Sequence, residues 1–279
     1  MFVREKVIKA ILDSGENFMS GEQLSKKLGI SRTAVWKHIN ALREEGYNIE
    51  SVNKKGYRLA EKPDDILSSE NIAYNLPTEF IGKKVIHLDT VGSTNDYAKE
   101  IGNKVSGGTL IISEQQTKGK GRLGRVWKSK SGDGIWMSLI IKPKIEPYKA
   151  PFLTLVAGAS VVKALSNLDV EASIKWPNDI IVHNKKICGI LTELSAEMER
   201  VNYVVIGIGI NIKTIDFPDE IKEKATSLYK EGYKLSRVDI VRQFCIEFEK
   251  LYKGYILDGN KQDTLELCRK YSAIIGKQV

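Results

Sequence analysis

Residues 115–127 read QQTKGKGRLGRVW and follow shortly after the apolar run 109–112. Between Lys118 and Arg125, three glycines alternate with four basic side chains. Glycine permits positive φ and a close approach of backbone to a ligand. Lysine and arginine supply cations that suit carboxylate and phosphate groups. We therefore interpret residues 116–127 as a glycine loop that closes over a small anionic ligand, with the rest of the chain as its support.

Two other interpretations of this stretch need weighing. It fits G-x-G-x-x-G, but a dinucleotide-binding fingerprint requires a helix immediately after it and an acidic residue about 20 positions on. Here residues 126–134 have the composition of a loop, and residues 135–141 have that of a strand, which disfavours that interpretation. A solvated basic loop without function is the remaining alternative, because runs of charge are commonly just solvated.

The composition describes a globular protein with room for one large and one small domain. The chain has 279 residues, of which 42% are hydrophobic and 28% charged. No apolar run approaches 18 residues and the N-terminus has no signal-peptide pattern, so we expect a cytoplasmic protein without a membrane partner. Three scattered cysteines and three scattered histidines indicate reduced thiols and no metal site.

The positive charge is concentrated near the N-terminus. Residues 1–62 hold 12 Lys/Arg against 8 Asp/Glu, so fewer than a quarter of the positions carry half of the net charge of +8. Such an imbalance indicates that the N-terminal piece meets a polyanion.

Residues 1–62 have the pattern of a winged helix-turn-helix. Apolar side chains at helical spacing predict a first helix that ends near Ser14, and a capping box, Ser20 with Gln23, opens a second through Leu28. A third helix over 32–45 follows the cap Ser31. Strand-like residues 49–52 and 57–59 flank a basic turn and predict a hairpin, or wing. For DNA contact we select the exposed polar residues of the third helix and the wing: Ser31, Arg32, Thr33, Lys37, Lys54 and Lys55. A three-helix packing module with a basic face is the alternative.

Residues 66–271 predict a mixed sheet covered by helices, an α+β domain, after a linker at 62–65. Strands are expected at 85–89, 109–112, 135–141, 172–175, 180–182, 187–194 and 204–211, and helices at 96–102, 151–168, 237–256 and 261–271. Ser93, Thr94 and Asn95 place short polar side chains at a helix start, where an ordinary N-cap is the competing interpretation. Lys175, Asn178 and Asp179 flank a Pro-fixed turn.

Five motifs in order resemble the biotin protein ligases. They are the residues 92–95 (GSTN), 116–127, 175–179 (KWPND), 186–191 (KICGIL) and 207–211 (GIGIN). With the winged helix in front, the chain is similar to bifunctional biotin ligases that also repress biotin-synthesis genes. The resemblance covers nearly the whole chain and implies a class II synthetase-like biotin/lipoate ligase domain.

The resemblance implies a two-step reaction in which biotin and ATP-Mg²⁺ form biotinyl-5′-AMP, and a lysine of a carboxylase carrier domain then accepts the biotin. It implies that biotin and its adenylate meet Ser93, Thr94, Asn95, Gln116, Lys120, Gly121, Arg122 and Lys186. It assigns the nucleotide side to Arg125, Trp127, Lys175, Asn178 and Asn211. Arg122 and Lys186 would stabilise the charged transition state, and Asp179 would help to deprotonate the acceptor lysine, unless it only stabilises its turn. Operator DNA and a ligand-dependent homodimer are the implied partners.

The chain departs from the family pattern in three places. Lys120 stands where the family usually has arginine, so a bidentate contact would be lost. Leu123 replaces an arginine near the dimer surface of relatives. Residues 273–279 have the pattern of an opening strand, so we expect 272–279 to be the truncated start of an SH3-like domain.

Two other functions stay open at this point. One is a ligand-sensing transcription factor that binds biotin without chemistry, and the other is a lipoate or octanoate ligase. The presence of Lys186 and Arg122 disfavours the sensor, and the Trp-Pro-Asn-Asp turn favours biotin.

Overall fold

The computed structural model describes residues 3–60 and 65–276. Its contacts divide the chain into two compact units, Met1–Asn75 and Leu76–Val279, and we describe each by itself. Most of the linker predicted at 62–65 lies outside the described residues. The N-terminal unit also contains a short helix that the sequence patterns did not predict, α4 (Ser69–Ala73).

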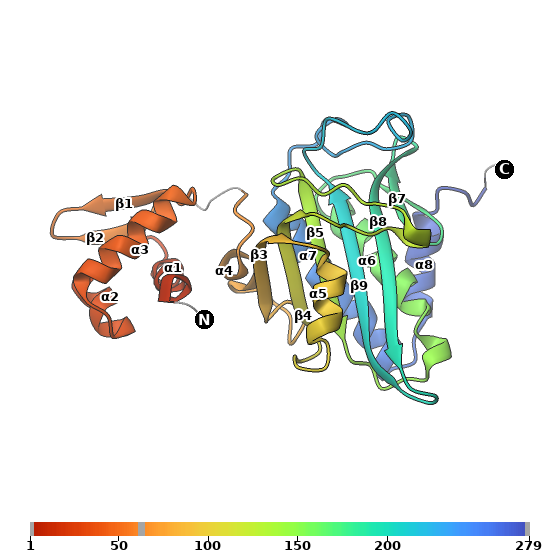
Figure 1. Ribbon diagram of the computed structural model, residues 1–279, viewed down its shortest axis with the longest axis horizontal. Helices are drawn as coiled ribbons and strands as arrows, with labels where there is room; N and C mark the ends of the chain where they lie inside the picture. Colours follow the sequence, from red (N-terminus) through yellow and green to blue (C-terminus); the bar gives the residue numbers. More distant parts are fainter. Residues whose placement is uncertain (1–2, 61–64, 277–279) are drawn as a thin grey trace. The chain divides into compact units, whose positions relative to one another are not determined.

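The N-terminal unit is a winged helix-turn-helix, as predicted (Figure 1). The predicted capping box forms: the Ser20 hydroxyl accepts from the Gln23 amide at 3.1 Å, and the Gln23 side chain accepts from the Ser20 amide at 2.7 Å. Leu24, Val35 and Ile39 are among the fully buried side chains that join the helices. Its main elements are α1 (Val3–Asp13), α2 (Gly21–Leu28), α3 (Arg32–Glu44), β1 (Ile49–Val52) and β2 (Gly56–Leu59).

The wing is fastened to the body of this unit by backbone contacts. β1 and β2 pair antiparallel from Ile49 opposite Leu59 to Val52 opposite Gly56. Met19 and Tyr57 then exchange two backbone hydrogen bonds of 2.9 Å. Gly56 has φ +112°, and a Cβ there would lie 2.3 Å from the Met19 carbonyl oxygen, so glycine is required where the wing meets the preceding loop.

The C-terminal unit is built on a seven-stranded mixed sheet in the order β3-β4-β5-β9-β8-β7-β6. β3 and β4 run parallel, and the other pairings are antiparallel. The α+β prediction is therefore confirmed. The strands are β3 (Val85–Val91), β4 (Thr109–Gln116), β5 (Gly134–Ile141), β6 (Ser173–Lys175), β7 (Asp179–Val182), β8 (Lys185–Ala196) and β9 (Val201–Asn211).

Helices cover the two faces of the sheet unequally. α5 (Thr94–Ile101) packs against β5 and β9 on one face, and α6 (Phe152–Ser166) and α7 (Arg237–Leu257) lie on the other (Figure 1). α8 (Gln262–Lys270) packs against α6 and α7. The stretch Pro147–Ser166, which contains α6, is long and apolar enough to cross a membrane, but 61% of its most apolar window is buried inside this unit.

Strand β9 presents different residue types to the two faces of the sheet. Gly207 and Gly209 alternate with isoleucines, and successive side chains of a strand point to opposite faces. The isoleucines therefore fill the helix-covered core, whereas the glycines leave the α5 face of the sheet open. A pocket forms on that open face.

The structure tests the predictions for the residues after the glycine loop and for residues 273–276. After Gly121 the chain makes only a short 3-10 turn, Arg122–Gly124, so no helix follows the glycine loop and the dinucleotide-binding alternative is excluded. Within the described residues 273–276 the chain forms bends and a turn instead of the predicted strand. Its neighbour Ser272 makes an isolated parallel bridge to Ile174 of the edge strand β6. Residues 277–279 lie outside the described part of the chain.

Candidate functional site

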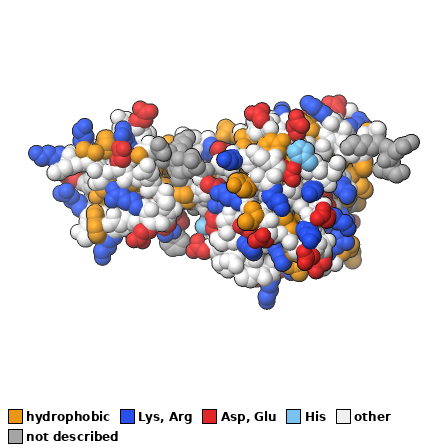
Figure 2. All heavy atoms as spheres, turned by 90° about the horizontal axis from the view of Figure 1, so that it is seen from above, with side chains coloured by type: hydrophobic (Ala, Val, Ile, Leu, Met, Phe, Trp, Pro, Cys, Tyr) orange, Lys and Arg blue, Asp and Glu red, His pale blue; other side chains and the backbone are white. Residues whose placement is uncertain are grey.

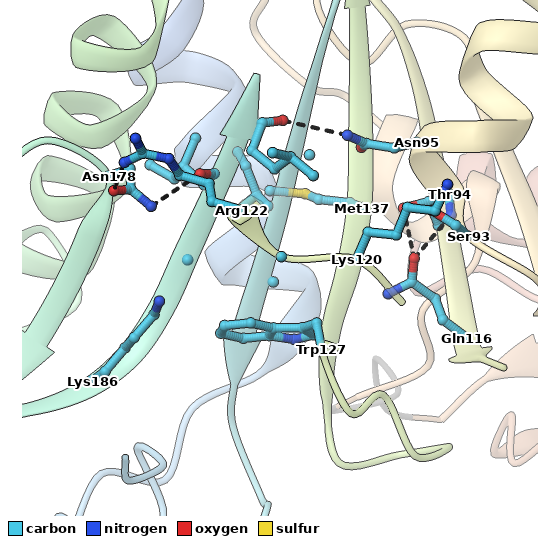
Figure 3. A pocket seen from close by; sticks show the side chains of 17 residues that line it. Ser93, Thr94, Asn95, Gln116, Lys120, Arg122, Trp127, Met137, Asn178 and Lys186 are labelled. Atoms are coloured by element: carbon cyan, nitrogen blue, oxygen red, sulfur yellow. Dashed lines mark hydrogen bonds between the residues drawn. The ribbon is translucent and has the colours of Figure 1, made fainter. Parts of the chain in front are cut away.

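A pocket opens on the α5 face of the sheet (Figure 3). Its walls come from the start of α5, the glycine loop, the turn between β6 and β7, and strands β5, β8 and β9. The structure thus gathers segments that are more than 100 residues apart in sequence. The lining residues are Ser93, Thr94, Asn95, Gln116, Lys120, Gly121, Arg122, Trp127, Met137, Asn178, Lys186, Gly189, Ile190, Leu191, Gly207, Ile208 and Gly209.

One end of the pocket is a connected set of neutral polar groups. The amide and hydroxyl of Thr94 donate to the Gln116 side-chain oxygen at 2.8 and 3.1 Å. The buried Ser138 hydroxyl lies 2.6 Å from Asn95 Oδ1 and 2.8 Å from Thr94 Oγ1. Ser93 caps α5 by accepting from the Asp96 amide. Because Ser93, Thr94, Asn95 and Ser138 are buried and these side chains hold one another in place, their donors and acceptors are preorganised for a polar ligand.

Two glycines form a flat floor under an aromatic ring. Gly189 and Gly209 lie opposite each other on β8 and β9, and the Trp127 indole covers both. A Cβ at Gly209 would lie 2.5 Å from Trp127 Nε1, and one at Gly189 would lie 2.8 Å from the ring carbon Cζ3. Lys186 Nζ is 5.3 Å from the indole centroid, within the range of a cation–π contact. The glycines are therefore needed so that the ring can reach the sheet.

Cations collect at the other end of the pocket. Lys186 Nζ pairs with Asp179 at 2.6 Å, and Asn178 Nδ2 donates to the same Asp179 oxygen at 3.1 Å. Arg122 reaches from the glycine loop to Asn178 Oδ1 at 2.6 Å, as Figure 3 shows. One basic group thus comes from the sheet and one from the loop, on either side of the space where a ligand would lie.

The tip of the glycine loop has an unusual backbone. Leu123 has φ 56° and ψ 37°, a left-handed conformation that costs a non-glycine residue about 1–2 kcal/mol. Its side chain is 90% exposed, and Val126 nearby is 78% exposed. The left-handed backbone and the exposed apolar side chains both cost free energy in the isolated protein. We therefore interpret the tip of the loop as a functional segment and not as part of the packed core.

Ten of the predicted ligand-site residues line this pocket, and four do not. Ser93, Thr94, Asn95, Gln116, Lys120, Gly121, Arg122, Lys186 and Asn178 are brought together, with Trp127 on the floor beside them. Asp179 lies just outside, paired with Lys186. Asn211 is buried and donates to the Thr226 carbonyl at 3.1 Å, and Arg125 and Lys175 are exposed away from the lining.

Sequence analysis missed part of the site. Met137 and the glycine pair Gly189 and Gly209 line the pocket, but none was selected as a site residue. The alternation of glycine with isoleucine in β9 is a signal that could have pointed to an open sheet face, but the side chain that covers this face could not be read from the sequence. Across residues 3–60 and 65–276, no group of three or more His, Cys, Asp or Glu side chains is placed to hold a metal ion.

A second candidate surface lies on the N-terminal unit. The predicted residues Ser31, Arg32, Thr33, Lys37, Lys54 and Lys55 are all exposed. Trp36, also exposed, at 55%, stands among them on α3. In the wing, Lys55 Nζ and the Arg58 guanidinium lie 5.9 and 4.7 Å from the Phe18 ring centroid. On the face of this unit that Figure 2 displays, Lys and Arg side chains are interspersed with Asp and Glu.

Each of the two units that carry these candidate surfaces matches a known family. Residues 88–211 match the biotin/lipoate A/B protein ligase family, and residues 3–58 match an HTH domain. The chain is 46% identical over 92% of its length to the bifunctional ligase/repressor BirA of Bacillus spizizenii, of which it covers 80%. It is 37% identical over 82% of its length to BirA of Escherichia coli, of which it covers 70%. A solved biotin protein ligase from Aquifex aeolicus, in complex with biotin and ATP, superposes with a TM-score of 0.59 at 33% identity, covering 68% of this chain and 79% of that one.

Proposed function

The chain belongs to the family of bifunctional biotin ligase/repressors, and from this premise we propose that it activates biotin with ATP, transfers the biotin to a carrier lysine, and represses transcription in response to the adenylate. The observation that carries the ligase proposal is the pocket. It sets a neutral polar end, Thr94 with Gln116, against a cationic end, Lys186 with Arg122. Biotin has the same division, with a neutral ureido ring at one end and a carboxylate at the other.

In the proposed binding mode, the ureido group exchanges hydrogen bonds with Thr94, Asn95 and Gln116, and Ser93 completes that end. Gly121 lets the loop backbone approach the ligand closely. The carboxylate then extends toward Lys186. Because the glycine loop crosses the pocket between these ends, its closure would exclude water from the bound acid.

The first step joins two anions, so positioned cations are the main requirement. A biotin carboxylate oxygen attacks the α-phosphorus of ATP, the bond from that phosphorus to the bridging oxygen breaks, and pyrophosphate leaves. Lys186 and Arg122 approach the reacting groups from opposite sides and would stabilise the charge that collects on the phosphorus. To do so, each must leave its present partner, Asp179 for Lys186 and Asn178 for Arg122.

The second step needs a neutral acceptor amine. The carrier lysine attacks the acyl carbon of the mixed anhydride, and AMP leaves. We assign Asp179 the help in removing the amine proton. The Asp179 carboxylate becomes available to accept this proton when Lys186 leaves it for the phosphate. The Lys186–Asp179 ion pair would therefore link the first step to the second.

We propose that the nucleotide lies at the Trp127 side of the pocket. Trp127 offers an aromatic surface next to Lys186, and Asn178 lines the pocket next to the Lys186–Asp179 pair. Arg125 and Lys175 would have to move toward the nucleotide, whereas Asn211 would act from its buried position. Mg²⁺ would enter as part of the ATP substrate, because none of the residues that line the pocket is a carboxylate.

For the repressor activity, we propose that α3 enters the major groove and that the wing lies along the phosphate backbone. A two-fold operator would be read by a homodimer that forms when the adenylate is bound. The exposed Leu123, at the tip of the loop that covers the ligand, would give such a dimer an apolar contact in place of the arginine of relatives. We place both activities in the cytoplasm.

The experiment that tests the ligase proposal combines purified protein with biotin and ATP and measures pyrophosphate release and biotinyl-AMP. Adenylate formation that depends on both substrates supports the proposal. Biotin binding without pyrophosphate release would instead support a ligand-sensing repressor. Preferential use of lipoate or octanoate in competition would support a ligase for those acids.

A further inference from the structure

The glycine loop is held across the pocket by one basic side chain on each side, through a hydrogen bond on one side and an ion pair on the other. On the β6–β7 side, Arg122 donates to Asn178 at 2.6 Å. On the α5 side, Lys120 Nζ contacts both carboxylate oxygens of Asp96, at 2.8 and 2.7 Å. In Figure 3 these two basic side chains point to opposite walls, Lys120 toward Ser93 and Thr94, and Arg122 toward Asn178. Asp96 itself does not line the pocket.

Asp96 is set in a wider network that starts at the polar end of the pocket. Lys99 pairs with Asp96 at 3.1 Å and with Glu193 of β8 at 2.7 Å. The other Glu193 oxygen accepts from Asn95 Nδ2 at 2.8 Å. Burial alone would raise the pKa of Asp96, but hydrogen bonds from Lys120 and Lys99 outweigh it and lower that pKa. Asp96 is therefore a fixed anion at the foot of the loop.

The Arg122–Asn178 and Lys120–Asp96 contacts differ in whether they can persist during the proposed reaction. Arg122 must release Asn178 to reach the phosphate, so the contact on that side is lost when the ligand is engaged. Lys120 already has its charge compensated by Asp96, and a lysine ammonium makes such a contact as a compact point charge. The α5 side can thus stay closed while Arg122 moves.

We infer that Asp96 is a positioning residue, which holds the glycine loop closed over the adenylate through Lys120 while Arg122 serves the phosphate. This inference rests on the proposed ligase function. It also gives a physical reason for the lysine at position 120, because the partner there is a carboxylate on α5 and not the ligand. The expected consequence is slow release of the adenylate before a carrier protein arrives.

The test compares Asp96→Asn with a matched control, Asp239→Asn. Asp239 occupies the same position on α7 as Asp96 does on α5, three residues after a capping serine whose hydroxyl accepts from its amide. It is exposed, so its substitution changes the same helix-end charge without touching the loop. Each protein is loaded with labelled biotinyl-AMP and chased with excess unlabelled biotinyl-AMP.

We expect Asp96→Asn to release the adenylate faster, by up to about 5-fold, the change that corresponds to about 1 kcal/mol for a partly exposed ion pair. Asp239→Asn should release it at the rate of the unchanged protein, and Asp96→Glu should restore most of the slow release. In a Lys120→Met background, Asp96→Asn should add nothing further. Equal release from Asp96→Asn and unchanged protein, or additive effects of the two substitutions, would overturn the inference.

A second readout does not depend on ligase activity. An arginine-specific protease should cut after the exposed Arg122 and Arg125 faster when the loop is released from Asp96, and neither site is altered in the variants. With no ligand added, Asp96→Asn should be cut several-fold faster than Asp239→Asn. If the unchanged protein forms no adenylate, the proposed function fails while this comparison still decides the role of Asp96. Equal cutting of the two variants would count against the contact as a loop anchor.

Discussion

Gly209 packs closely against the Trp127 indole, which covers the floor of the pocket. A Cβ on Gly209 would lie 2.5 Å from Nε1 and 2.6 Å from Cε2 of that ring. Real Cβ atoms do not approach so closely, and the indole is rigid, so in Gly209→Ala the ring must leave the floor of the pocket. Overpacking of this kind costs about 1–3 kcal/mol.

Two measurements follow from this displacement. The free energy of unfolding should fall by about 1–3 kcal/mol in Gly209→Ala, with each 1 kcal/mol lowering the Tm of a domain this size by roughly 2–4 °C. If the displaced ring no longer offers its face to the nucleotide, kcat/KM for ATP in adenylate formation should fall about 10- to 100-fold, since 1.4 kcal/mol is tenfold in rate.

Gly158→Ala is the matched control, because Gly158 is a buried glycine of the same unit. A Cβ there meets Ile190 Cδ1 at 3.8 Å, an ordinary contact, so this variant should keep full activity and lose no stability. A second control places Gly209→Ala in a Trp127→Ala background, where the added methyl has no indole to displace and should cost little. Full activity and stability of Gly209→Ala with Trp127 present, or an equal cost with and without the indole, would refute the reasoning.

Three further predictions concern other parts of the molecule. Lys186→Met should lower the rate of adenylate formation about 10²- to 10³-fold, because it removes a preorganised cation from the reacting groups; pyrophosphate release measures this, and a loss below tenfold would contradict the assignment. Lys37→Ala and Lys55→Ala should each weaken operator binding and reduce the slope of log K against log salt by about 0.9, and unchanged titrations at low and high salt for both would refute the helix-and-wing surface. Glu249→Gln should lower the free energy of unfolding by about 1–3 kcal/mol at pH 7, because the Glu249 carboxylate accepts from the amides of Glu79, Phe80 and Ile81 at 2.6, 2.9 and 2.9 Å. Burial would raise the pKa of Glu249, but these amides lower it below its ordinary value of 4.5, so its contribution is present above that pH and is lost as the pH falls. Denaturant titrations should therefore show the difference between Glu249→Gln and unchanged protein shrinking below pH 4.5, and a difference that is constant with pH would argue against the ionised carboxylate.

Local patterns determined much of this protein. The capping box at Ser20 and Gln23, the periodic apolar residues of α1 and the short strands of the wing each act over a few residues, so they predicted the winged helix directly. The mixed sheet followed in the same way from strand-like and helix-like stretches. The strand that became β9 was also predicted, at residues 204–211.

Only the tertiary structure decided which side chains meet. Asp96 is 24 residues from Lys120 in sequence, and Trp127 is 82 residues from Gly209, yet each pair is in contact because the order of strands brings α5, the glycine loop and β9 to one face of the sheet. Ion pairs and ring contacts depend on distances between side chains, which neither spacing nor composition encodes. For that reason the sequence could indicate that Lys120 is a loop cation, whereas the fold revealed that its charge is already compensated by Asp96.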